Sequence, residues 1–97
     1  MLAELLRVKG ELVLLAGHDA AGIAQEHFQR SLGLARDQAA LAWELRTATS
    51  LAGLWKRQRR TSQARALLAP VYGRFTEGLD TTDVVAAKAL LKTLRAL

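Results

Sequence analysis

The stretch WELRTATSLAGLWKRQRRTSQARALLAPVYGRF, residues 43–75, decides the fold of this chain. In its first half, small and apolar residues recur at helical spacing: Leu45, Ala48, Leu51, Ala52 and Trp55. In its second half, the same spacing joins Ala64, Leu67, Leu68 and Val71. A period of about 3.6 residues predicts two helices, each with one buried face. The basic segment KRQRRT between them must stay in solvent, so we expect the helices to fold back on each other as an αα-hairpin.

The composition predicts one helical domain. The chain has 97 residues, of which 51% are hydrophobic, so a single folded domain is expected and disorder is not. The absence of cysteine excludes disulfides and thiolate metal sites and fits a reducing, cytoplasmic compartment. Glu4 and Glu11 interrupt the apolar run at the amino-terminal end, which indicates an amphipathic helix and neither a signal peptide nor a membrane span.

Apolar periodicity predicts three further helices, at about residues 2–16, 20–36 and 82–96. The two helices of the quoted stretch extend to about 39–57 and 61–78, with a kink or break expected just before Pro70. We therefore predict an all-α fold of about five helices. It divides into hairpin 1 (about 2–36), hairpin 2 (about 39–77) and a terminal capping helix (about 82–96).

A weak internal repeat joins the two hairpins. The pattern Ala24-x-x-x-Phe28 recurs forty residues later as Ala64-x-x-x-Leu68, and each copy follows a small residue. The two small residues are Gly10 and Ala52. The arrangement resembles the tetratricopeptide pattern, in which small residues let antiparallel helices approach closely. It predicts tetratricopeptide-like hairpins in a right-handed α-α superhelix, with the small residues buried between helices.

Three phrases carry a closer resemblance: AELLRVKGELVL, WELRTATSLAGLW and LLAPVYGRFTEGLDTTDVVAAKALL. They resemble the C-terminal tetratricopeptide-like region of bacterial multidomain signalling ATPases, which are transcriptional regulators and class III adenylate-cyclase-like proteins. The resemblance implies a cytoplasmic helical scaffold with a role in autoinhibition or partner sensing. It implies no ATPase or cyclase activity in this chain, which contains no G-x-x-x-x-G-K-[ST] motif.

Few residues suggest catalysis or metal binding. His18 and His27 are nine positions apart, which matches neither H-E-x-x-H nor a zinc-binding spacing. His27 groups with apolar neighbours and is expected to be packed or half-buried. Ser31 and Ser50 have no evident base, and no pair of carboxylates shares a site. We therefore predict no enzyme activity, no cofactor and no metal.

The tetratricopeptide pattern places a groove along the first helix of each hairpin. The residues that map onto it are Glu4, Arg7, Glu11, Arg46, Thr49, Gly53 and Lys56. Arg46 and Lys56 suggest capture of a peptide carboxylate or an acidic helix. The alternative is that these positions are merely solvated.

Self-association is a second hypothesis. Helical arrays generally need three or more repeats, and this chain has about two and a half. Several large apolar residues are expected to lack cover within the chain: Leu5, Leu12, Leu14, Leu15 and Trp43. A homodimer through the first helices would cover them, as would further repeats of a longer chain.

Nucleic-acid binding is the third hypothesis. The net charge is +5, and much of it is concentrated in one turn that could neutralise phosphates. The basic residues are Lys56, Arg57, Arg59 and Arg60, with Arg65 nearby. Trp55 is expected to pack inward, which leaves no clear aromatic to stack on a base. The alternative is a solvated basic loop.

Overall fold

The computed structural model describes residues 2–17 and 20–96, which form five helices and no strand. The helices are α1 (Leu2–Ala16), α2 (Ala21–Asp37), α3 (Leu41–Arg57), α4 (Thr61–Gly73) and α5 (Thr82–Ala96). The predicted all-α class and the approximate positions of the five helices are confirmed. His18 lies outside the described residues.

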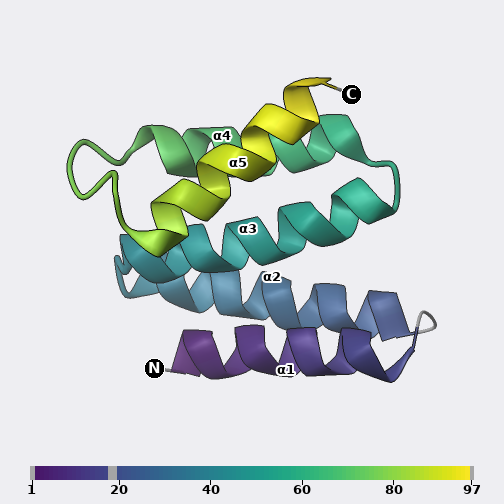
Figure 1. Cartoon of the computed structure of the whole chain (residues 1–97). Coiled ribbons are helices and arrows are strands. Elements are labelled where there is room, and N and C mark those ends of the chain that lie inside the picture. Colours follow the sequence, from purple (N-terminus) through teal and green to yellow (C-terminus); the bar gives the residue numbers. More distant parts are fainter. Residues whose placement is uncertain (1, 18–19, 97) are drawn as a thin grey trace.

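The helices form an antiparallel stack with α1 at one edge and α4 and α5 at the other (Figure 1). Each helix packs against the next one along the chain, and α3 also packs against α1 and α5. The central helix α3 therefore contacts all four other helices. The outward side of α1 has no further helix of the described chain over it (Figure 1).

Two apolar clusters form the core. The larger one lies mainly between α3, α4 and α5, and the smaller one joins α2 and α3, with Val13 and Leu14 of α1 packed against it. Trp55 and Leu67 pack against both clusters and so connect them. Trp55 thus packs inward, as expected.

The four small residues of the repeat pattern are all buried. Ala24, Ala52 and Ala64 have no exposed surface, and Gly10 is buried on the inner side of α1. The small residues were expected to let helices approach closely, and the nearest neighbour of Gly10 is a side chain of α2, that of Phe28. A Cβ atom added at Gly10 would lie 2.6 Å from Cε1 of Phe28, whose ring is fully buried.

The turns that follow α2 and α3 have the same geometry. Ala39 and Arg59 occupy equivalent positions and both have left-handed backbone, with φ of 52° and 63°. In each turn the next amide donates back across the helix end, from Ala40 to the carbonyl of Ala35 and from Arg60 to that of Trp55, both at 2.8 Å. These hydrogen bonds define Schellman motifs. A repeated helix end thus sets the direction of both α3 and α4.

Helix α4 differs from the prediction in two ways. It passes through Pro70 without a break, and it ends at Gly73 and not at Gly78. Pro70 and Ala66 are both exposed, so the carbonyl that loses its donor can be hydrated. Beyond Gly73 the amides of Arg74 and Phe75 bond three residues back, at 3.2 and 3.1 Å, which tightens and closes the last turn.

Candidate functional site

The predicted groove residues Glu4, Arg7 and Arg46 come together between α1 and α3. Nε of Arg7 lies 2.8 Å from Oε1 of Glu4, and Nη1 of Arg46 lies 3.0 Å from Oε2 of the same carboxylate. Nη2 of Arg7 also donates to Oε2 at 2.9 Å, so Arg7 bonds to both oxygens of Glu4, and Oε2 accepts from Arg46 of α3 as well. The group connects α1 to α3 at the start of α1.

The same network includes two residues that sequence reasoning did not place there. Nη2 of Arg46 lies 2.8 Å from Oδ2 of Asp83, in the first turn of α5, and Nη1 of Arg7 donates to Oγ of Ser50 at 3.4 Å. Arg46 thus bridges carboxylates from α1 and α5. Its guanidinium already holds two carboxylates of the chain itself, so its first function is to connect three helices.

The hydrogen bonds of this network shift the pKa values of its members. The hydrogen bond from Arg7 holds the pKa of Glu4 below its ordinary value, and the same bond raises the pKa of Arg7. The hydrogen bond to Asp83 raises the pKa of Arg46. All three groups therefore keep their charges at neutral pH.

The other predicted groove residues do not join the network. Oγ1 of Thr49 donates to the carbonyl of Leu45 at 2.8 Å, within α3. Glu11 and Lys56 are half-buried, and none of the ion pairs found in residues 2–17 and 20–96 includes either of them. The predicted groove set is therefore divided between an ion-pair network and separate side chains.

A second polar group fixes α1 from its inner side. Oγ of Ser31 donates to the carbonyl of Ala3 at 2.5 Å, and it lies 2.8 Å from Oγ1 of Thr47. Since the single proton of Ser31 is directed at Ala3, Thr47 must be the donor to Ser31. Both hydroxyls are buried, and the three residues come from α1, α2 and α3. Ser31 therefore has a structural role that the sequence did not reveal.

The basic turn is partly anchored to the fold. The guanidinium of Arg60 lies 4.7 Å from the centre of the Trp55 ring, and its Nη1 donates to Oε1 of Gln25 at 3.1 Å. The indole N–H of Trp55 donates to the same oxygen at 2.9 Å. Arg57 and Arg59 are exposed, whereas Arg60 is half-buried. The predicted patch therefore contains two exposed arginines, and Arg60 stabilises the turn.

A buried carboxylate that sequence reasoning missed lies between α2, α3 and the end of α4. The side chain of Glu44 is 5% exposed, and its two oxygens accept from Nε of Arg36 at 3.2 Å and Nη1 of Arg74 at 3.0 Å. Both arginines are more than half exposed. The three residues border a hollow of about 370 Å³ whose apolar side includes Leu67 and Pro70. These two ion pairs connect α3 to α2 and to the end of α4.

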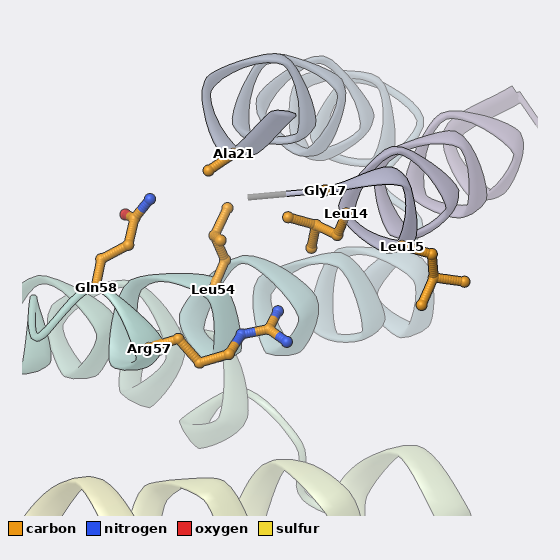
Figure 2. A pocket seen from close by; sticks show the side chains of 7 residues that line it. All are labelled: Leu14, Leu15, Gly17, Ala21, Leu54, Arg57 and Gln58. Carbon is orange, nitrogen blue, oxygen red and sulfur yellow. The ribbon is translucent and has the colours of Figure 1, made fainter. Parts of the chain in front are cut away.

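A larger hollow, of about 540 Å³, lies where α1 ends, α2 begins and α3 ends. Its lining is mainly apolar, and Arg57 and Gln58 border it on α3. In Figure 2, Leu14 points toward Leu54, whereas Leu15 lies on the outer side of α1. The hollow therefore adjoins the outward side of that helix.

Helix α1 carries two apolar rows with the same spacing. The inner row contains Ala3, Leu6, Gly10 and Val13, of which the first three are buried. The outer row, displaced by two residues, contains Leu5, Val8, Leu12 and Leu15, which are 52%, 37%, 59% and 84% exposed. A displacement of two residues rotates a row by about 200° around a helix, so the outer row faces away from the core.

The predicted exposure of Leu5, Leu12 and Leu15 is confirmed. The prediction was wrong for Leu14 and Trp43, which are half-buried. Leu14 packs against the smaller core cluster because the end of α3 lies beside it. Val8, which belongs to the outer row, was missed although it lies three residues after Leu5 and four before Leu12.

His27 is half-buried, as expected, and its buried Nδ1 has no hydrogen-bond partner in the described chain. No group of three or more His, Asp or Glu residues in the described ranges could hold a metal ion. None of the five helices in those ranges is long and apolar enough to cross a membrane. Comparison of the chain with protein-family models, with curated proteins and with solved structures found no match.

Proposed function

We propose that this chain is a non-catalytic protein-interaction scaffold that associates with a second copy of itself through the outer row of α1. The observation that supports this proposal is the pair of apolar rows on opposite sides of one helix. A helix that is apolar on two sides is generally covered on both of them. Within the described chain only the inner row of α1 has such cover.

The outer row differs from ordinary surface leucines. Single exposed apolar side chains are common and need no explanation, whereas contiguous apolar patches generally mark interaction sites. Here four large side chains follow one another along a helix, and the hollow beside Leu14 and Leu15 extends the apolar surface at one end. The outer row contains more apolar surface than the inner one, since it has no alanine or glycine.

Polar contacts hold α1 in place on the rest of the fold. Ser31 holds the carbonyl of Ala3, and Arg46 holds the carboxylate of Glu4, so the first turn of α1 is attached to α2 and α3. Binding to a helix that is already fixed costs less ordering than binding to a mobile segment. These contacts support a role for α1 as a binding surface.

The proposal includes a tetratricopeptide-like superhelix, a cytoplasmic location and a place in a signalling or transcriptional regulator. The contacts of α3 with both α1 and α5 support the superhelix, because they bring the odd-numbered helices side by side. The resemblance of the sequence to the terminal repeats of signalling ATPases supports the regulator. In that setting an acidic peptide would meet Lys56, which takes part in no ion pair of the described residues, whereas Arg46 is already bonded to Glu4 and Asp83. Nucleic acid is the less favoured partner, because Arg60 is already engaged with Trp55 and Gln25.

Light scattering coupled to size-exclusion chromatography tests the proposal. We expect the mass of the wild-type chain to rise from monomer to dimer between low micromolar and several hundred micromolar protein. The double variant Leu5→Gln and Leu12→Gln should remain monomeric with unchanged helicity. Val85→Gln is the matched control, because Val85 is 53% exposed on α5 and away from α1. A wild-type chain that stays monomeric at the highest concentration would refute self-association.

A further inference from the structure

We infer that the two copies pair with their α1 helices parallel, about a twofold axis that runs along the helices. This inference rests on the proposed self-association and adds its orientation and register. It comes from two features of α1, the spacing of the outer row and the charges beside it.

The outer row has the spacing of a coiled-coil seam. Leu5, Val8, Leu12 and Leu15 are separated by three, four and three residues, which is the a and d pattern of two heptads. Such a pattern lets two helices pack side by side along their length and not cross at a steep angle. In a parallel pair each residue of the row lies opposite its own copy. In an antiparallel pair Val8 lies opposite Leu12, and Leu5 lies opposite Leu15.

The charges beside the row distinguish the two orientations. Glu4 and Glu11 lie on one side of the row, at g positions, and Lys9 lies on the other side, at an e position. A parallel pair brings g positions next to e positions of the partner, so Lys9 of each copy lies near Glu4 of the other, whose carboxylate is already bonded to Arg7 and Arg46 of its own chain. In an antiparallel pair, Glu11 of one copy lies next to Glu11 of the other, and Lys9 lies next to Lys9 of the other. Like charges at such sites are destabilising, so the parallel pair is favoured.

The size of the interface sets the expected affinity. A standard stable complex involves roughly 20–30 residues on each side. The outer row with its flanking charges provides far fewer, so association should be reversible and concentration-dependent, in the micromolar range. The experiments therefore need to be made at high protein concentration.

Cysteine cross-linking measures the orientation directly, because the natural chain contains no cysteine. The variants Val8→Cys and Leu12→Cys are oxidised mildly, each alone and in an equal mixture, and the products are separated by mass under non-reducing conditions. If the pair is parallel, each variant alone forms a disulfide between its two copies. In the mixture, the disulfide that joins residue 8 to residue 12 is then no more abundant than these. Val85→Cys on α5 measures random collisions.

Each outcome has one meaning. Predominance of the mixed Val8–Leu12 disulfide would overturn the parallel orientation while leaving self-association intact. Cross-linking of both variants at the rate of Val85→Cys would overturn the pairing through α1 altogether. If the wild-type chain still dimerised by light scattering, the proposed self-association would then have to use another surface.

A charge variant gives a second readout that does not depend on introduced cysteines. Lys9 is exposed, so Lys9→Gln should leave the fold unchanged. In a parallel pair Lys9 faces Glu4, which is already paired with Arg7 and Arg46, so this variant should leave the affinity of the dimer nearly unchanged. In an antiparallel pair the variant removes the repulsion between the two copies of Lys9 and should raise the affinity, which would overturn the parallel orientation. Lys88→Gln, also exposed and on α5, is the control for the change in net charge.

Discussion

Replacement of Gly10 by alanine tests how closely the ring of Phe28 packs against α1. In an unhindered helix, alanine is favoured over glycine by about 1 kcal/mol. At Gly10 the added methyl group would lie 2.6, 2.9 and 3.0 Å from three atoms of the Phe28 ring. Real Cβ atoms do not approach carbon so closely, and the ring is fully buried, so it cannot turn aside freely.

The expected net effect is a loss of stability. Overpacking of a core typically costs about 1–3 kcal/mol, and three contacts at or below 3.0 Å place Gly10→Ala in the upper part of that range. After the gain in helix propensity, the net loss in the free energy of unfolding should be about 1–2 kcal/mol. For a domain of this size, each kcal/mol lowers the melting temperature by roughly 4–8 °C.

Urea and thermal unfolding followed by circular dichroism measure this effect, at one low protein concentration so that self-association does not contribute. Gly33→Ala is the matched control, because it lies in α2 with no atom within 4 Å of the added Cβ, and it should be stabilising. In the background of Phe28→Leu, where the ring is absent, Gly10→Ala should change sign and become stabilising too. If Gly10→Ala stabilised the wild-type chain as Gly33→Ala does, the proposed contact between Gly10 and Phe28 would be wrong.

Three further predictions concern the helix ends and the ion pairs. Ala39→Gly should stabilise the chain by about 0.5–1 kcal/mol in urea unfolding, because an alanine in left-handed backbone is strained, and Ala40→Gly should not. Glu44→Gln should cost about 1–2 kcal/mol in the same assay, because it removes the charge that two arginines bind. The cost stays moderate because both arginines are more than half exposed and can be hydrated. The pKa of Glu4 is lower in the folded chain than its ordinary value of 4.5, so its contribution to stability is present above that value and is lost as the pH falls through the folded pKa. Glu4→Gln should therefore flatten the dependence of the unfolding midpoint on pH between about 5 and 3, and an unchanged slope would show that Arg7 does not lower the pKa of Glu4.

The sequence predicted the parts of the fold that depend on local spacing. The helices and the burial of Ala24, Ala52 and Ala64 follow from a period that any short window of residues displays. The end of α4 was misplaced by five residues. Its termination at Gly73 depends on backbone hydrogen bonds made by Arg74 and Phe75, and these have no side-chain signature.

The polar contacts depend on which helices become neighbours, so local patterns could not predict them. Arg46 bonds to Glu4 and Asp83 across 42 and 37 residues. Glu44 was missed although the sequence contained a signal for it. It lies four residues before Ala48 and seven before Leu51, which places it on the buried side of α3. An acidic residue within an apolar row requires a cationic partner, and two arginines supply it here.

The two rows of α1 raise the question of why the less apolar one faces the core. Hydrophobicity alone would bury the outer row, since the inner row contains Ala3 and Gly10. Shape and polar bonding favour the opposite choice. Only the inner row has a glycine that admits the Phe28 ring, and only in the observed rotation does Ser31 reach the carbonyl of Ala3 while Arg46 reaches Glu4. Rotation of α1 by half a turn would leave a buried hydroxyl without its acceptor and place a leucine or a valine against that ring. The contacts that fix α1 in the fold therefore also keep its more apolar row outside, where a second copy can bind it.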